Sequence, residues 1–303
     1  MPTSWFLVGF GLMGAGDLYG VYYLNYIMNQ TTNQTTNIAA VDVHGHYGDY
    51  GNAQEGSPLR NFSTGDAAEV VRRARSANIE WTIVSPLTAL MPRGRADAFA
   101  GNLEAAQTVS QTPGLLQYVV LDPRDQRTFQ QADEMLKLPR CVGIKIHPEE
   151  HCYPITDYGW RIFEFAAARR AIVLTHTSER NSLAADFVAP ADAFPEVRII
   201  LAHIGCGWDG DLTHQVRAIQ QCRHANMFAD TSSASSITPR LIEWAVHEIG
   251  ADRVLFGTDT PLYFTAMQRI RIDQADLPEV AKHQILRHNA IKLFDLARLT
   301  SGK

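Results

Sequence analysis

The stretch Ala39-Ala40-Val41-Asp42-Val43-His44-Gly45-His46 introduces a pattern that the rest of the chain repeats. Apolar, mostly β-branched residues lead into polar residues at its end, as expected for a buried parallel strand. Similar runs follow, separated by segments with helical periodicity such as Ala67–Ala77, Trp160–Ala168 and Pro239–Ile249. The predicted strands are Ala39–His46, Glu80–Ser85, Leu115–Leu121, Val142–His147, Ala171–His176, Val197–His203, Met227–Asp230 and Val254–Asp259.

The alternation of strands and helices predicts a parallel α/β fold. Successive strands are about 25 to 40 residues apart, which is the length of one βα unit, and eight such units make a (β/α)8 TIM barrel. No repeat or low-complexity linker divides this region, so we predict a single barrel domain over residues 38–303. Residues 1–37 would form an N-terminal extension. The segment His288–Phe294 is expected to be the last helix, which closes the ring.

The composition is typical of a soluble globular enzyme. The chain has 303 residues, of which 46% are hydrophobic and 19% charged. Its formal net charge is −5 and no basic run occurs, which argues against nucleic acid as a partner. The 4 cysteines form no CxxC pair, so we expect reduced thiols and a cytoplasmic protein.

The first 37 residues are the least typical part of the sequence. Trp5–Met28 is apolar and aromatic, but Asp17 and Asn25 interrupt it, and no Lys or Arg precedes Arg60. A secretory signal needs a positive N-terminal region, and a membrane span needs about 20 apolar residues. We therefore expect an extension or a segment packed on the barrel, with membrane association or secretion as the minor alternative.

Side chains that bind metals stand at the ends of five predicted strands. They are His44, His46, His147, His176, His203 and Asp259. Active sites of barrels form at the carboxyl ends of the strands, so these residues should meet there. Alternation along a strand points His44 and His46 the same way, and imidazole with carboxylate suits zinc, manganese or iron rather than calcium. A lone strand histidine is more often a hydrogen-bonded core residue, and a lone strand-end Asp is often a helix cap. The joint pattern favours a metal site.

Taken in this order, the motifs resemble the amidohydrolase superfamily. The closest branch is amidohydrolase 2, the TIM-barrel metal-dependent hydrolases, and the resemblance covers residues 39–296. The motifs that carry it are Val41-Asp42-Val43-His44-Gly45-His46, Gly143-Ile144-Lys145-Ile146-His147-Pro148, Leu174-Thr175-His176-Thr177, Leu201-Ala202-His203-Ile204-Gly205 and Phe256-Gly257-Thr258-Asp259-Thr260-Pro261.

The resemblance implies a role for each matching residue. His44, His46, His176 and Asp259 would hold a divalent metal, with zinc expected and manganese or iron as alternatives. Asp259 would also accept a proton from metal-bound water. His203 would be a second-site ligand in a centre with two ions, or a catalytic group in a centre with one.

Several residues are candidates for substrate binding. Lys145 shares a face of the fourth strand with His147. The resemblance implies either that Lys145 is carboxylated and bridges two metals, or that it pairs with a substrate carboxylate or a core acid. His147 would contact the substrate or support the site, and His151, in the following loop, would line the pocket. Arg240, after the seventh strand, and Arg93, after the second, are candidate carboxylate clamps, although surface or ion-paired arginines are more common.

The function expected from the resemblance is metal-dependent hydrolysis of an amide, cyclic amide or lactone by an activated water. The alternative is a mononuclear metal-dependent non-oxidative decarboxylase of an unsaturated or aromatic carboxylic acid. A catalytically silent barrel used for binding is a third reading, which the full ligand set disfavours. A small-molecule substrate, with carboxylates among the candidates, and a homo-oligomeric state are expected.

Overall fold

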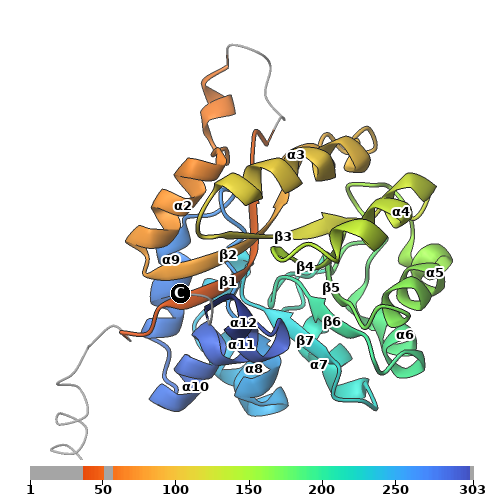
Figure 1. Cartoon of the computed structure of the whole chain (residues 1–303). Coiled ribbons are helices and arrows are strands. Elements are labelled where there is room, and N and C mark those ends of the chain that lie inside the picture. Colours follow the sequence, from red (N-terminus) through yellow and green to blue (C-terminus); the bar gives the residue numbers. More distant parts are fainter. Residues whose placement is uncertain (1–36, 51–56, 301–303) are drawn as a thin grey trace, which may run out of the picture. The chain divides into compact units, whose positions relative to one another are not determined.

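The computed structural model describes residues 37–50 and 57–300. Apart from residue 37, the predicted N-terminal extension lies outside these ranges. Eight parallel strands form one sheet in which neighbours follow chain order (Figure 1). The strands are β1 (Ala40–Tyr47), β2 (Ile79–Pro86), β3 (Leu115–Val120), β4 (Cys141–Ile146), β5 (Ile172–Thr175), β6 (Arg198–Leu201), β7 (Met227–Asp230) and β8 (Val254–Leu255).

The sheet curls into a nearly closed ring. The main-chain N–H of Val43 donates to the carbonyl of Phe256 at 2.9 Å, and that of Asp259 donates to the carbonyl of His44 at 2.7 Å. Gly45 and Thr260 form a parallel bridge. The residues that follow β8 therefore pair with β1, and the predicted (β/α)8 barrel is confirmed.

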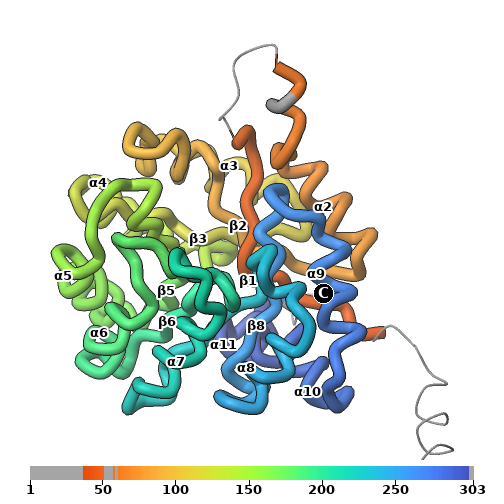
Figure 2. Tube along the Cα trace, turned by 180° about the vertical axis from the view of Figure 1, so that it is seen from behind, coloured from red at the N-terminus to blue at the C-terminus, as the bar shows by residue number. Residues whose placement is uncertain are grey.

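Helices surround the strands (Figure 1). They are α2 (Ala67–Ser76), α3 (Ala98–Gln111), α4 (Gln126–Met135), α5 (Ile155–Ala167), α6 (Val188–Ala193), α7 (His214–Gln221), α8 (Leu241–Ile249), α9 (Thr265–Asp273), α10 (Glu279–His283), α11 (Asn289–Leu293) and α12 (Ala297–Thr300). Short 3-10 turns span Pro58–Asn61, Leu87–Ala89, Ala184–Phe187, Ala234–Ile237 and Ala251–Arg253. Seen from behind, α9 lies beside α2 (Figure 2). Within the described ranges, no helix has both the length and the hydropathy of a membrane span.

The core has two layers, set by the alternation of side chains along each strand. On β4, Ile144 and Ile146 face the helices, whereas Lys145 between them is fully buried and reaches His44. The amino-terminal end of the barrel is closed by the C-terminal helices. There the ring of Phe294 meets Tyr118 edge-on, with 6.1 Å between the centroids. The polar strand ends are thus left at the open, carboxyl end.

The last elements differ most from the prediction. β8 has 2 residues instead of the predicted run to Asp259, because the chain beyond Leu255 bonds to β1 and to the C-terminal segment. The N–H of Phe256, for example, donates to the carbonyl of Ile285 at 3.1 Å. The expected helix His288–Phe294 is present as α11, but a π-helical turn, Gln284–His288, precedes it, and α12 follows it, so it is not the last helix.

Candidate metal centre

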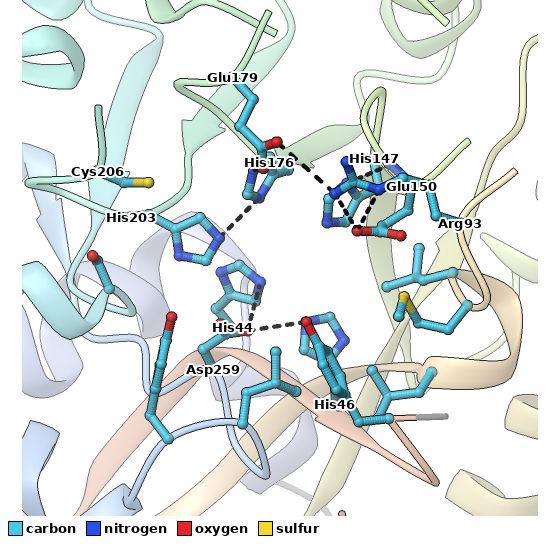
Figure 3. Close-up of a pocket in the computed structure, with 17 residues that line it drawn as sticks. His44, His46, Arg93, His147, Glu150, His176, Glu179, His203, Cys206 and Asp259 are labelled. Atoms are coloured by element: carbon cyan, nitrogen blue, oxygen red, sulfur yellow. Dashed lines mark hydrogen bonds and ion pairs between the residues drawn. The ribbon is translucent and has the colours of Figure 1, made fainter. Parts of the chain in front are cut away.

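A cavity of about 240 Å³ opens at the carboxyl ends of the strands (Figure 3). Its walls come from residues that follow most of the strands. All of the strand-end residues singled out in the sequence line it, namely His44, His46, His147, His176, His203 and Asp259. The barrel therefore brings together side chains that are more than 200 positions apart in the sequence.

Three of these residues converge on one point. The candidate ligand atoms of His44, His46 and Asp259 lie within 4.8 Å of one another, and all three residues are buried. Nε2 of His46 is 3.1 Å from Oδ1 of Asp259, and Nε2 of His44 is 3.6 Å from the same oxygen. Both histidines belong to β1, and Asp259 lies in the segment that closes the ring onto β1. Ring closure therefore assembles the group.

The hydrogen bonds of His46 show that a cation fits this group. Nδ1 of His46 lies 3.0 Å from both the main-chain carbonyl and the hydroxyl of Ser85. The carbonyl can only accept, so in the tautomer that bonds to it Nδ1 carries the hydrogen. In the neutral ring Nε2 is then a bare lone pair that faces the carboxylate of Asp259. Two acceptors at this distance repel unless a proton or a cation lies between them. Imidazole nitrogen with carboxylate oxygen suits zinc, manganese or iron.

Two residues of the cavity have unusual backbone conformations. His203 has φ 72° and Asp259 has φ 56°, in the left-handed region that residues other than glycine rarely adopt. Buried hydrogen bonds hold both: His203 N donates to a carboxylate oxygen of Asp230 at 3.0 Å, and Asp259 N donates to the carbonyl of His44. Strain of this kind persists where the surrounding structure fixes it, and it clusters at functional sites.

His176 lies in the cavity, but its ring nitrogens face other partners. Nδ1 is 3.1 Å from Nε2 of His203, and Nε2 is 2.9 Å from Oε1 of Glu179. Its ring stacks on His147 with 4.3 Å between the centroids. Burial lowers the pKa of both His147 and His203 well below the usual range, so both rings are neutral at pH 7. The role of His176 as a metal ligand stays a prediction.

Comparison with known proteins identifies the family. The sequence profile of the amidohydrolase family matches residues 41–296, which is most of the chain. The chain belongs to this family. No curated protein sequence matches it.

Solved structures with the same fold share little sequence with this amidohydrolase. A 2,6-dihydroxybenzoate decarboxylase from Rhizobium has a TM-score of 0.67 at 17% identity, over 86% of this chain and 99% of the other. A dihydroxybenzoic acid decarboxylase from Polaromonas with bound manganese and an inhibitor has a TM-score of 0.66 at 18% identity, over 86% and 98%. A candidate 2-pyrone-4,6-dicarboxylic acid hydrolase from Pseudomonas putida has 0.59 at 15%, over 85% and 98%. At these identities the likeness concerns the fold.

Lys145 is fully buried next to the candidate metal ligands His44, His46 and Asp259. Its Nζ lies 2.8 Å from Nε2 of His44. Burial lowers the pKa of the Lys145 ammonium to about 8, which leaves a neutral fraction at mildly alkaline pH. A carboxylated lysine that bridges two metals stays a prediction, because the contact to His44 is equally compatible with a plain amine.

Two buried carboxylates at the site had no role in the sequence-based prediction. Asp42 accepts hydrogen bonds from the main-chain N–H groups of His44 and Thr258, at 3.1 Å and 3.0 Å, and from the Thr258 hydroxyl at 2.6 Å. Burial raises its pKa to about 8. Asp230, at the end of β7, lies 2.9 Å from Nδ1 of His44. Asp42 interrupts an apolar strand run and Asp230 ends one, and these polar positions were the signal that could have found them.

The rim of the cavity is charged, and one part of its lining is apolar and aromatic. Arg93 donates to Oε1 of Glu150 at 2.8 Å, and its Nη2 lies 3.8 Å from Oε2 of Glu179. These two acids follow β4 and β5, and sequence reasoning gave neither a role. Apolar and aromatic lining comes from Tyr50, Leu87, Leu90, Met91, Leu262 and Tyr263.

Two residues predicted to bind substrate are not brought to the cavity. His151 is buried behind it, where its Nε2 lies 2.9 Å from the carbonyl of Ala89. Arg240 is exposed at the start of α8, where its φ is 67°. Neither lines the cavity, because the loop after β4 turns His151 inward and the chain after β7 runs on before Arg240. Of the predicted substrate residues, His147 lines the cavity and Lys145 lies behind His44.

Proposed function

We propose that this member of the amidohydrolase family is a metal-dependent non-oxidative decarboxylase of an unsaturated or aromatic carboxylic acid. The observation that carries the proposal is the make-up of the cavity. The cavity combines one convergent His44, His46 and Asp259 group with lining that is partly apolar and aromatic, and a cationic side chain, Arg93, stands at the rim. A flat, apolar ring fits such walls, and its acid group fits a cationic centre. The similar folds of two dihydroxybenzoate decarboxylases support this reading.

The metal would be held by His44, His46 and Asp259, with His176 as a further candidate. Bound there, a divalent ion would supply a Lewis acid that binds substrate oxygens and offsets negative charge that develops during the reaction. Manganese is the first ion to test, because it is bound in one of the similar structures. Zinc stays the expectation from the ligand types.

Decarboxylation breaks the bond between the ring carbon and the carboxylate, and the electron pair left on carbon takes up one proton. We assign delivery of this proton to Asp259, which lines the cavity beside His44 and His46: its carboxylate would first take the proton from a water molecule or from the acid group of the substrate and then pass it to the ring carbon. His203 is neutral because burial lowers its pKa, so we assign it a hydrogen bond to a substrate oxygen. Arg93, held by Glu150 and close to Glu179, would be a hydrogen-bond donor for the substrate at the rim.

Release of carbon dioxide tests the proposal. The manganese-loaded enzyme should release labelled carbon dioxide from a panel of hydroxylated benzoates that includes 2,6-dihydroxybenzoate and 5-carboxyvanillate. Asp259→Asn should lower kcat/KM by on the order of 100-fold or more, as expected for loss of a proton-transfer group. Arg127→Ala, at an exposed ion pair with Asp125 outside the cavity, is the matched control. Product without carbon dioxide release would contradict the proposal.

Hydrolysis of an amide, cyclic amide or lactone is the second candidate function. The observation that favours it is the carboxylate of Asp259 next to the bare Nε2 of His46, where it could take a proton from an attacking water. A panel of lactones and cyclic amides, assayed under the same conditions, separates the two functions. Ring opening without loss of carbon would establish the hydrolase.

A further inference from the structure

We propose that Asp230 is a positioning residue that fixes His44 in the one tautomer able to bind a metal. This inference rests on the proposed metal-dependent function. Metals bind the unprotonated nitrogen of a histidine, and the hydrogen bond of the other nitrogen decides which one that is. Nδ1 of His44 lies 2.9 Å from Oδ2 of Asp230, and neither residue is more than 1% exposed.

The contacts of Asp230 allow it only to accept. Oδ1 accepts from the main-chain N–H groups of His203 and Ser232, each at 3.0 Å, and from the Ser232 hydroxyl. Oδ2 is then left to accept from Nδ1–H of His44. It therefore holds the hydrogen of His44 on Nδ1.

The opposite edge of the His44 ring leads to the same tautomer. Nζ of Lys145 lies 2.8 Å from Nε2 of His44. When Lys145 is an ammonium group, which can only donate, Nε2 is the accepting, unprotonated nitrogen. Nε2 is also the atom that faces Asp259 in the metal group. Two independent contacts, one on each ring nitrogen, thus agree.

Asp230 could also be considered as a metal ligand, since its carboxylate lies near nitrogens of His44 and His203. Its hydrogen bonds favour the positioning role, because donors already occupy both oxygens. Ser232 strengthens this arrangement: its Oγ lies 3.0 Å from Nδ1 of His44 and 2.8 Å from Nδ1 of His203. Asp230 and Ser232 together contact Nδ1 of His44, and Ser232 also contacts Nδ1 of His203.

Asp230→Asn tests the inference with almost no change in shape. The two main-chain N–H groups keep the amide oxygen in the place of Oδ1, so the amide nitrogen takes the place of Oδ2. It would then donate to Nδ1 of His44 and force the ring hydrogen onto Nε2. We expect the affinity for Mn²⁺ to fall about 10- to 100-fold, as for other residues that support metal-binding histidines.

Asp42→Asn is the matched control. Asp42 is equally buried and bonds to the main chain of His44, but its hydrogen-bond partners do not include a histidine ring. An amide there still accepts from two N–H groups, and it can donate to the Thr258 hydroxyl. Its affinity for Mn²⁺ should stay close to that of the wild type.

Two measurements decide the question. Electron paramagnetic resonance of free Mn²⁺ gives the affinity of wild type and both variants, with melting of the metal-free proteins as the test of folding. Nitrogen NMR of ¹⁵N-histidine-labelled wild type, with His44 assigned through His44→Gln, gives the tautomer directly. Weaker binding in Asp230→Asn alone, with the hydrogen on Nδ1, supports the inference.

Other outcomes overturn it. Equal affinity in folded Asp230→Asn and wild type, or an equal loss in both variants, removes the special role of Asp230. A hydrogen on Nε2 of His44 does the same, and this result remains decisive if Asp230→Asn does not fold. Wild type that binds no Mn²⁺ overturns the proposed function, whereas the NMR result still judges the tautomer.

Discussion

Gly45, between the two histidines of β1, leaves no room for a side chain. A Cβ there would lie 2.6 Å from Cγ2 of Thr82 and 3.2 Å from Cγ2 of Thr260. Thr82 is buried and β-branched, so it cannot turn aside easily. We expect Gly45→Ala to lower the free energy of unfolding by about 1–3 kcal/mol and to weaken Mn²⁺ binding, because β1 must shift. Chemical denaturation and metal titration measure the two effects.

Gly159→Ala is the control for this substitution. The nearest neighbour of a Cβ at Gly159 is Cγ1 of Ile155, at an ordinary 3.5 Å. Gly159 lies inside α5, where alanine is favoured over glycine by about 0.5–1 kcal/mol. Gly159→Ala should therefore keep or raise stability. Unchanged stability and metal binding in Gly45→Ala would show that β1 or Thr82 can move to accommodate the methyl group, and would contradict the prediction.

At the same scale, the residues that face the cavity were more predictable than those that support them. His44 and Asp259 stand at strand ends, where the barrel geometry places an active site, and so could be found from position alone. Asp230 contacts His44 from 186 positions away, and no local pattern encodes that contact. The position of His151 behind the cavity was not predictable for a related reason, because a loop gives no alternation from which the direction of a side chain follows.

Among the elements, α2 offers a direct test of how local sequence defines a boundary. Asp66 precedes the helix, and its carboxylate accepts from the N–H of Glu69 at 2.8 Å. Asp66→Ala should lower the free energy of unfolding by about 1 kcal/mol, because that N–H loses its partner, whereas Asp66→Ser should retain most of the stability. Urea denaturation compares the variants. Equal stability of all three proteins would mean that water replaces the cap without cost.

Elements with strong local patterns were predicted closely. β7 agrees with the predicted Met227–Asp230, and α2 ends one residue before the prediction. β8 was predicted too long, since β-branched and apolar residues continue past Leu255 although the chain there leaves β7 for β1. The π-helical turn that precedes α11 has no signal in residue spacing.

For the whole molecule, removal of metal should weaken the barrel without unfolding it. The core is apolar on both sides of the sheet and does not depend on the metal group. An ion that binds only the folded state adds about 2.7 kcal/mol when its concentration is 100 times Kd. Chelation should therefore lower Tm reversibly and leave the far-ultraviolet circular dichroism spectrum unchanged. Loss of that spectrum on chelation, or a Tm that chelator and Mn²⁺ leave unmoved, would contradict this.

The barrel itself was predictable as a whole because its evidence is repeated along the chain. Each βα unit contributes a similar signal, so an error at one strand end does not alter the count or the order. The chemistry was less predictable, since the candidate ligands are compatible with both hydrolysis and decarboxylation. Part of the cavity lining, such as Met91 and Tyr263, also comes from loops without periodic patterns.

The closure of the ring onto β1 also has a consequence for how the protein is made. His44 and His46 precede Asp259 by more than 200 residues, so they are synthesised well before it. A nascent chain therefore carries the two imidazoles without their carboxylate partner, and the proposed metal site is completed only when the last strand docks. Only the folded barrel would therefore bind the ion, and a product that stops before Asp259 would not bind it.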